Sequence, residues 1–75
     1  MSTADVTIHL DSEPSGALRS DIESRVASLD GVTEVSFSAK ASHLMVVHFD
    51  SRKLHTDKIL EAVRRTGVGA ELIGL

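Results

Sequence analysis

The 75-residue sequence contains no cysteine, tryptophan or tyrosine, and it has only one proline and two phenylalanines. Without cysteine the chain cannot form disulfides, bind iron–sulfur clusters, hold zinc or copper through thiolates, or use a cysteine nucleophile. Its longest apolar run, Leu44-Met45-Val46-Val47, is far shorter than the roughly 20 residues that cross a bilayer. The N-terminus lacks the basic and apolar regions of a secretory signal. We therefore expect a cytoplasmic protein with no membrane insertion.

Length and charge restrict the function further. A chain of 75 residues fits one domain, residues 1–75, with a small core. The net charge is −3, and no strong basic excess or set of stacking aromatics is present, so we expect no nucleic-acid partner. Most basic residues cluster late in the chain, where they predict a solvated helix face: Arg52, Lys53, Lys58, Arg64 and Arg65.

The first half of the chain predicts a strand, a helix and another strand. Apolar residues alternate with polar ones over residues 5–11, which is typical of a half-buried strand. Residues 12–16 form a turn in which Pro14 or Ser15 is suited to open a helix. Helical spacing follows at Leu18, Ile22, Val26 and Leu29, and Asp30-Gly31 is expected to close the helix. Alternation returns over residues 32–39.

The second half predicts a strand, a helix and a final strand. Residues 43–50 form the third strand, Thr56 is expected to cap a helix, and Gly67 is expected to end it. Residues 69–74 complete a short fourth strand. The order β-α-β-β-α-β predicts a ferredoxin-like α+β fold in two layers. With right-handed crossovers the antiparallel sheet takes the strand order 4-1-3-2.

Several segments resemble the heavy-metal-associated (HMA) domain of copper chaperones and metal-pumping ATPases. They are Leu-Asp-Gly-Val-Thr-Glu-Val at 29–35, Met-Val-Val-His-Phe-Asp at 45–50, and Thr-Gly-Val-Gly-Ala at 66–70. The resemblance extends from Val6 to Ile73. It implies the same fold and a setting in metal handling or metal transport.

The metal-binding motif of that family is degenerate in this chain. The family places Gly-Met-x-Cys-x-x-Cys between the first strand and the first helix. By counting back from Gly31, the two cysteine positions fall on Ser15 and Leu18, and the Gly-Met positions fall on Ser12 and Glu13. None of these residues supplies a thiolate, so the resemblance does not carry the metal site with it.

A second resemblance leads to a different function. The segment from Asp11 to Leu18 is similar to the Asp-x-Pro-Gly-x-Leu loop of ACT domains, which bind amino acids at subunit interfaces on the same topology. Ser15 separates the Pro-Gly pair here. A domain that senses a small ligand such as an amino acid is therefore the alternative.

Histidine is the one borderline-soft ligand present in number, with four copies. The alternation predicts that His9 and His48 point to the open face of the sheet. On neighbouring antiparallel strands they could be diagonal neighbours, about 7–8 Å apart. Such a pair would bind Zn(II), Cu(II) or Ni(II) weakly, and we otherwise expect no cofactor. His43 is expected to cap the sheet edge, and His55 to face solvent.

The open face of the sheet is the predicted interaction surface: His9, Leu44, Val46, His48 and Ile73. Apolar residues on an uncovered face favour docking of a protein partner or self-association, although scattered aliphatics are also common on small monomers. RNA-recognition modules of this topology need stacking aromatics here, but both phenylalanines have core parity.

No pattern in the sequence indicates catalysis. The serines and paired carboxylates lie in turns or on a helix surface, and the glycines form neither a phosphate loop nor a dinucleotide fingerprint. We predict a non-catalytic binding or docking module connected with metal handling, without thiolate metal binding.

Overall fold

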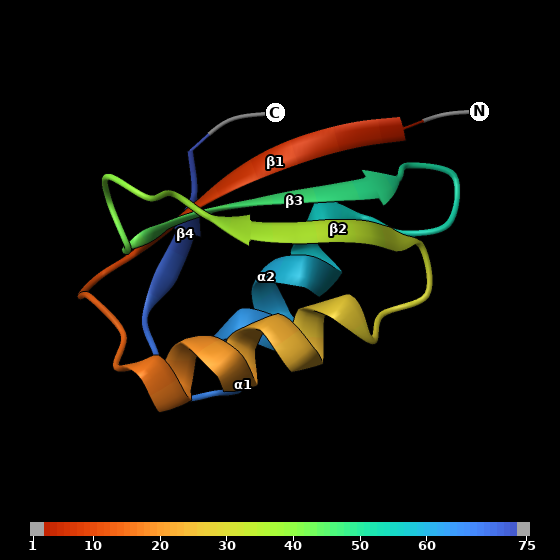
Figure 1. Ribbon diagram of the computed structural model, residues 1–75. Helices are drawn as coiled ribbons and strands as arrows, with labels where there is room; N and C mark the ends of the chain where they lie inside the picture. The colour runs from red at the N-terminus through yellow and green to blue at the C-terminus, as the bar shows by residue number, and fades with distance from the viewer. Residues whose placement is uncertain (1–2, 74–75) are drawn as a thin grey trace.

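A computed structural model describes residues 3–73 as four strands and two helices in the predicted order. Figure 1 shows the elements, whose bounds are β1 (Thr3–Leu10), α1 (Gly16–Ala27), β2 (Val32–Phe37), β3 (Leu44–Asp50), α2 (Thr56–Arg64) and β4 (Ala70–Leu72). The predicted strand at 69–74 ends earlier, and its residue 74 lies outside the described part. The chain is a ferredoxin-like βαββαβ domain.

The sheet has the order β2-β3-β1-β4, which is the predicted 4-1-3-2. All of its pairings are antiparallel. The central pair, β1 and β3, runs in continuous register from Thr3 opposite Asp50 to His9 opposite Leu44. On the other side of β3 the register shifts between Val32 and Glu34, so Thr33 is the extra residue of a β-bulge. The bulge places Glu34 directly opposite His48.

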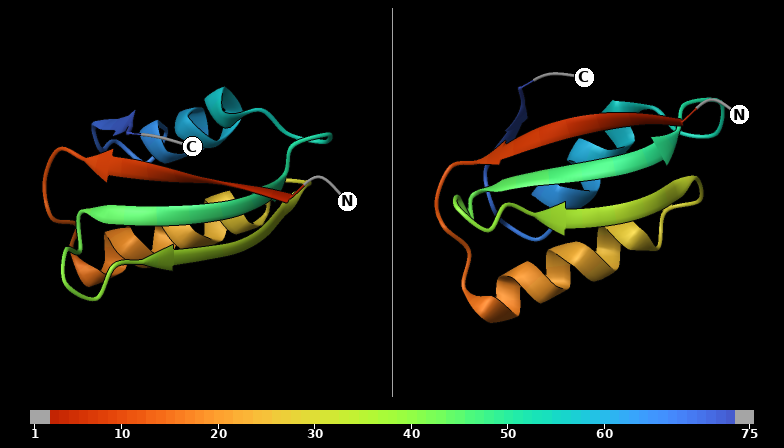
Figure 2. Two further views of the ribbon diagram at one scale, coloured as in Figure 1. Left: turned by 90° about the horizontal axis from the view of Figure 1, so that it is seen from above. Right: turned by 45° about the horizontal axis from the view of Figure 1, so that its top comes forward.

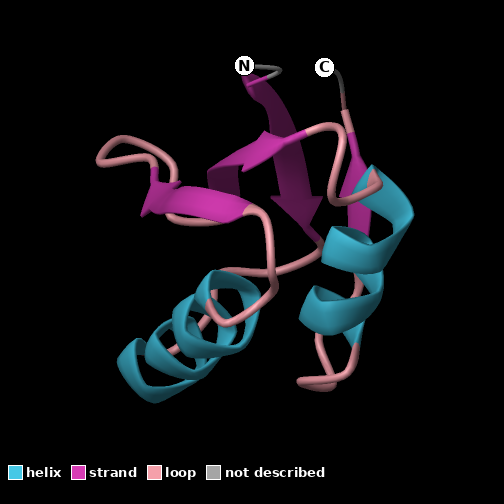
Figure 3. Cartoon of the chain, turned by 90° about the vertical axis from the view of Figure 1, so that its right-hand side faces the viewer, coloured by secondary structure: helices cyan, strands magenta, loops and turns pink. Residues whose placement is uncertain are grey.

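Both helices cover the same face of the sheet, and the opposite face is open. Figure 3 shows the two layers from the side, and both views of Figure 2 show α1 and α2 side by side on that face. The period of two in a strand explains the division. The inward residues of β1 and β3 are buried, with exposed fractions of 0–3%: Val6, Ile8, Leu10, Met45, Val47 and Phe49.

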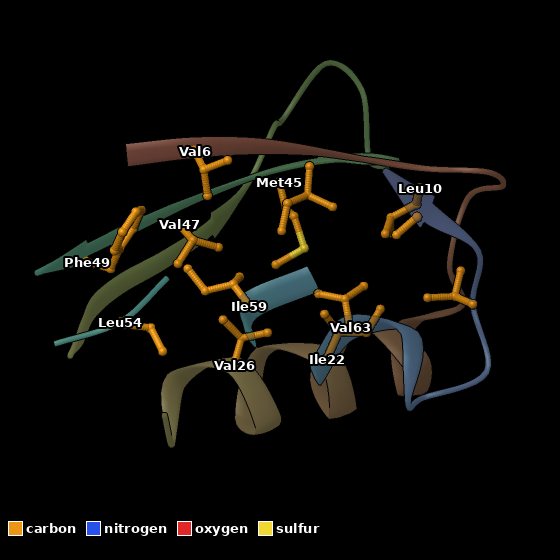
Figure 4. Close-up of a cluster of buried hydrophobic side chains, with 13 residues drawn as sticks. Val6, Leu10, Ile22, Val26, Met45, Val47, Phe49, Leu54, Ile59 and Val63 are labelled. Atoms are coloured by element: carbon orange, nitrogen blue, oxygen red, sulfur yellow. The ribbon is translucent and has the colours of Figure 1, made fainter. Parts of the chain in front are cut away.

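The core lies between the sheet and the helices (Figure 4). Ile22 and Val26 of α1 and Ile59 and Val63 of α2 are fully buried against the strands. Their spacing of four residues places each pair on one side of its helix. Burying an aliphatic side chain of this size stabilises the fold by about 1.5–3 kcal/mol, so these residues fix the helix layer on the sheet.

Helix ends differ from the prediction in two places. Thr56 is the first residue of α2 and not its cap, because His55 has the extended backbone of an N-cap and makes no side-chain capping bond. Helix α1 ends at Ala27, where the C-cap Ser28 donates its hydroxyl to the carbonyl of Arg25 at 2.8 Å. Gly31 therefore serves the turn into β2, with φ of 107°, and does not close the helix directly.

The glycine turns give the first testable prediction. Gly31 and Gly67 both have positive φ, but a Cβ at residue 31 would also lie 3.0 Å from the Lys53 Cβ, whereas one at residue 67 meets nothing within 4 Å. Gly31→Ala should lower the free energy of unfolding by about 1–3 kcal/mol, and Gly67→Ala by less, about 1–2 kcal/mol. Urea denaturation measures both changes.

Gly16→Ala is the matched control, because Gly16 lies at the start of α1 and a Cβ there meets open space. It should change stability by less than about 0.5 kcal/mol. Equal stability of the three variants would show that neither turn needs its left-handed backbone.

Candidate functional site

The loop between β1 and α1 and the first turn of α1 contain the four predicted positions of the metal-binding motif, Ser12, Glu13, Ser15 and Leu18. Ser15 is the N-cap of α1: its Oγ accepts a hydrogen bond from the backbone N–H of Leu18 at 3.1 Å. Leu18 is half-buried and packs against the core. Both positions therefore carry structural tasks, while Ser12 and Glu13 are exposed in the turn. A hydroxyl and an aliphatic group give no pair of soft ligands for copper(I).

The same loop is braced by the connection between α2 and β4. The backbone N–H of Asp11 donates to the carbonyl of Gly69 at 2.9 Å. The Asp11 carboxylate lies directly against Gly69, and a Cβ at residue 69 would collide with it. This contact was not predicted from the sequence. The signal that could have found it is Gly69 itself, in the Thr-Gly-Val-Gly-Ala segment at 66–70. A glycine beside a strand often marks a place where another group approaches the backbone closely.

The prediction that His9 and His48 are diagonal neighbours is wrong. His9 lies opposite Leu44 and His48 opposite Asp5, so the two histidines are 48 − 44 = 4 positions apart along the strands. At about 3.3 Å per residue they are separated by roughly 13 Å. No single metal ion can bridge that distance. The prediction had the correct face but assumed a register that the ladder does not have.

Each of these histidines instead faces a carboxylate on the strand next to it. His9 Nδ1 lies 3.7 Å from an Oε1 of Glu71 on β4, and His48 Nε2 lies 3.7 Å from an Oε1 of Glu34 on β2. Both are directly opposed cross-strand pairs. The imidazoles are about one third exposed, at 35% and 36%. Each contact is an ion pair when its imidazole carries a proton.

His43 is the neighbour of His9 that the sequence did not predict. It directly precedes the first residue of β3, so the alternation within that strand does not determine its orientation. The rings of His9 and His43 lie edge to face, with their centroids 5.1 Å apart and their planes at 86°. The backbone N–H of Leu10 donates to the His43 carbonyl at 2.7 Å and holds the two segments together.

The strand residues of the open face include carboxylates but no lysine or arginine. Of the described residues, the four strands contain Asp5, Glu34, Asp50 and Glu71, and every lysine and arginine lies in a helix or loop. The backbone N–H of Arg52 donates to Asp50 at 2.9 Å. This bond, helped by the Arg52 and Lys53 charges, holds the pKa of Asp50 below its ordinary value. Within the described part of the chain, no ion pair joins Asp5, Glu34 or Glu71 to a lysine or arginine.

The apolar part of the predicted interaction surface lies between these charges. Leu44 and Val46 of β3 are half-buried, and Ile73 is 52% exposed. The backbone N–H of Ile73 donates to Thr7, which lies opposite Val46, so the two aliphatic side chains flank Thr7 across the face. The five predicted surface residues therefore share one face. The two histidines belong to different cross-strand pairs, because His9 lies opposite Leu44 and His48 lies opposite Asp5.

Both phenylalanines belong to the core side, as predicted. Phe49 is 3% exposed, and Phe37 packs against the core while the Arg19 guanidinium lies 5.7 Å from its ring centroid. Among residues 3–73 no aromatic ring other than histidine is available for base stacking on the open face. No group of three or more His, Asp or Glu side chains in this part of the chain is arranged to hold a metal ion.

Comparison with known proteins identifies the family. The sequence model of the heavy-metal-associated domain matches residues 15–68, which is more than half of the chain. The chain belongs to the heavy-metal-associated family. Among curated proteins, none matches the chain. The described part of this HMA domain contains no helix that is both long and apolar enough to span a membrane.

Several solved structures share the fold of this chain. The oxidized form of MerP from Ralstonia metallidurans CH34 is 21% identical, with a TM-score of 0.83 over 95% of this chain and 97% of that one. The N-terminal domain of a potential copper-translocating P-type ATPase from Bacillus subtilis is also 21% identical, with a TM-score of 0.84 over 96% and 89%. The CopZ metallochaperone is 18% identical, with a TM-score of 0.77 over 93% and 100%.

These matches favour the first of the two resemblances. The HMA match begins at Ser15 and includes the whole stretch from the first helix to Val68. None of the three structures is described as an ACT domain. The similarity of the loop at 11–18 to the ACT loop stays a prediction without further support.

The cap at Ser15 gives the second testable prediction. Ser15→Ala removes the oxygen that accepts from Leu18 and should lower the free energy of unfolding by about 1 kcal/mol. Ser15→Asp keeps a capping oxygen and should stay close to the wild type. Thermal or urea unfolding, followed by far-UV circular dichroism, measures the difference.

The control is Ser20→Ala, because Ser20 is exposed in the middle of α1. It should change stability by less than about 0.5 kcal/mol. If Ser15→Ala proved as stable as Ser20→Ala, the hydroxyl at the cysteine position would have no capping role.

Proposed function

We propose that this HMA domain is a non-catalytic docking module of metal handling or transport that binds a protein partner and does not carry a thiolate-bound metal. The observation that carries the proposal is the charge of the open sheet face, where Asp5, Glu34 and Glu71 form no ion pair with a lysine or arginine of residues 3–73. The use of Ser15 as a helix cap supports the second half of the proposal. A side chain that caps α1 through its hydroxyl offers no thiolate to a metal ion.

The open face fits a partner with a basic surface. Asp5, Glu34 and Glu71 are exposed and belong to three different strands, so their charges spread across the face. The half-buried Leu44 and Val46 and the exposed Ile73 provide apolar contact area between them. Complementary charges steer association and fix orientation, while a small apolar centre supplies contact without permanent assembly.

The setting of the proposed function follows from the relatives. Structures with this fold are described as a domain of a potential copper-translocating ATPase, a copper transporter domain and a metallochaperone. A chain of the same family without cysteines can meet such proteins through protein contacts alone. We therefore take the partner to be an HMA protein of metal transport that presents lysines and arginines.

Copper(I) competition tests the absence of a thiolate site. The wild type should leave the copper(I) complex of bicinchoninate unchanged, because its loop offers Ser15 and Leu18 in place of two sulfur ligands. Ser15→Cys combined with Leu18→Cys should withdraw copper(I) and bleach the absorbance of the complex. Leu18→Cys alone is the control and should withdraw much less. One equivalent of copper(I) taken by the wild type would contradict the proposal.

Docking is tested by NMR titration in the presence of EDTA. Thiolate-bearing HMA proteins encoded in the same genome are purified and added one by one to the ¹⁵N-labelled chain. We expect shift changes at β1, β3 and β4 residues of the open face for a partner with a basic surface. Asp5→Asn combined with Glu34→Gln and Glu71→Gln should weaken binding at least tenfold, because it removes three negative charges from the open face.

The matched control neutralises acidic residues of the helix layer. Asp57→Asn combined with Asp21→Asn should leave binding within about twofold, since both residues lie on helices. Shift changes confined to α1 and α2 would overturn the proposal. A dimer of the chain alone, measured by light scattering and mapped to the open face, would also overturn it, because the occupant would then be a second copy.

A further inference from the structure

Two histidine side chains meet at the end of the open face nearest the degenerate loop. His9 is the second-last residue of β1, and His43 directly precedes β3. Figures 1 and 2 show that the β2–β3 connection and the β1–α1 connection leave the sheet at the same end. The hydrogen bond from the Leu10 N–H to the His43 carbonyl, 2.7 Å long, fixes the two backbones against each other.

We propose that His9 and His43 together bind a borderline divalent cation, Zn²⁺, Ni²⁺ or Cu²⁺, with Glu71 positioning the His9 ring. The proposal does not depend on the docking function. It replaces the predicted His9–His48 pair, which the strand register separates, by a pair that the structure brings into contact.

The separation of the two rings suits a shared metal ion. A Zn–N bond of about 2.1 Å places a metal roughly 3.2 Å from the centroid of each imidazole, and a tetrahedral angle then separates the centroids by about 5.2 Å. The observed separation is 5.1 Å. Rotation about the Cβ–Cγ bond, a soft torsion, turns each ring about an axis close to its centroid and so preserves this distance. The His43 ring can therefore turn without changing the separation of the centroids, while the His9 ring keeps Nδ1 beside Glu71.

The surroundings of the His9 Nδ1 atom provide a second, independent observation. This atom is covered by its neighbours and has no hydrogen-bond partner in residues 3–73, while an Oε1 of Glu71 lies 3.7 Å away. Metal-binding histidines almost always donate their second ring N–H to a carboxylate or carbonyl oxygen. A small shift of Glu71 would let it accept from Nδ1, and Nε2 is then the nitrogen that meets the metal.

The donor set determines which metal binds and how strongly. Two neutral imidazoles favour borderline divalent cations, whereas copper(I) prefers sulfur. Since no third His, Asp or Glu among the described residues completes the group, water fills the remaining positions. The site is therefore of modest affinity and open to exchange. Protons compete with the metal for both nitrogens, so acid weakens metal binding.

Zinc titration followed by imidazole NMR tests the proposal, with His48 and His55 serving as internal controls. Zn²⁺ alone should shift the resonances of His9 and His43 in a saturable manner and leave those of His48 and His55 in place. His9→Gln and His43→Gln should each weaken binding at least tenfold. His48→Gln and His55→Gln are the matched controls and should bind as the wild type does.

Glu71→Ala separates the positioning role from ligation. It should weaken zinc binding tenfold or more while the shifts at His9 and His43 remain the ones that respond. In the wild type, binding at pH 5.5 should be at least tenfold weaker than at pH 7.5. Equal shifts at all four histidines, or zinc affinity unchanged in His43→Gln, would overturn the proposal. The docking titration contains EDTA, so a failure of this site leaves that result intact.

Discussion

The antiparallel ladder between β1 and β3 is the constraint on which the rest of the structure depends. Its continuous register places Val6 beside Val47 and Ile8 beside Met45, all nearly inaccessible to solvent, and so provides the centre of the sheet side of the core. Because side chains alternate, the same register also determines which residues share the open face. A shift of this register by one residue would turn the buried apolar side chains to the open face and the carboxylates toward the core. The core and the candidate surface are thus two consequences of one pairing.

The loop before α1 shows how a metal-binding position can become a structural one. Every α-helix begins with backbone N–H groups that lack partners within the helix. Ser15 satisfies that of Leu18 with its own hydroxyl, and Leu18 adds apolar contact with the core. The loop therefore stays folded without a metal to organise it, and Asp11 braces it against Gly69. In this chain capping by Ser15 and packing of Leu18 hold the start of α1, and neither contact needs a metal ion.

The fold could be predicted from the sequence because its evidence is local. Alternation at Val6, Ile8 and Leu10 and helical spacing at Ile22 and Val26 each identify an element, and the order of elements then restricts the topology. The candidate site could be predicted only in part. Alternation assigned His9 and His48 to the correct face, but their separation depends on which residues pair across two strands. His43 lies before its strand, where alternation gives no orientation, so its contact with His9 needed the three-dimensional arrangement.

The two proposals share one residue, and this has a thermodynamic consequence. Glu71 contributes charge to the docking face and also lies beside His9. A divalent cation held by His9 and His43 adds positive charge at one end of the acidic face and draws Glu71 toward Nδ1. Both effects weaken the attraction of the face for a basic partner. By linkage, a bound partner then lowers the affinity for the metal by the same factor. Metal and partner would therefore compete without occupying the same space, because the carboxylate that positions the imidazole is also one that attracts the partner.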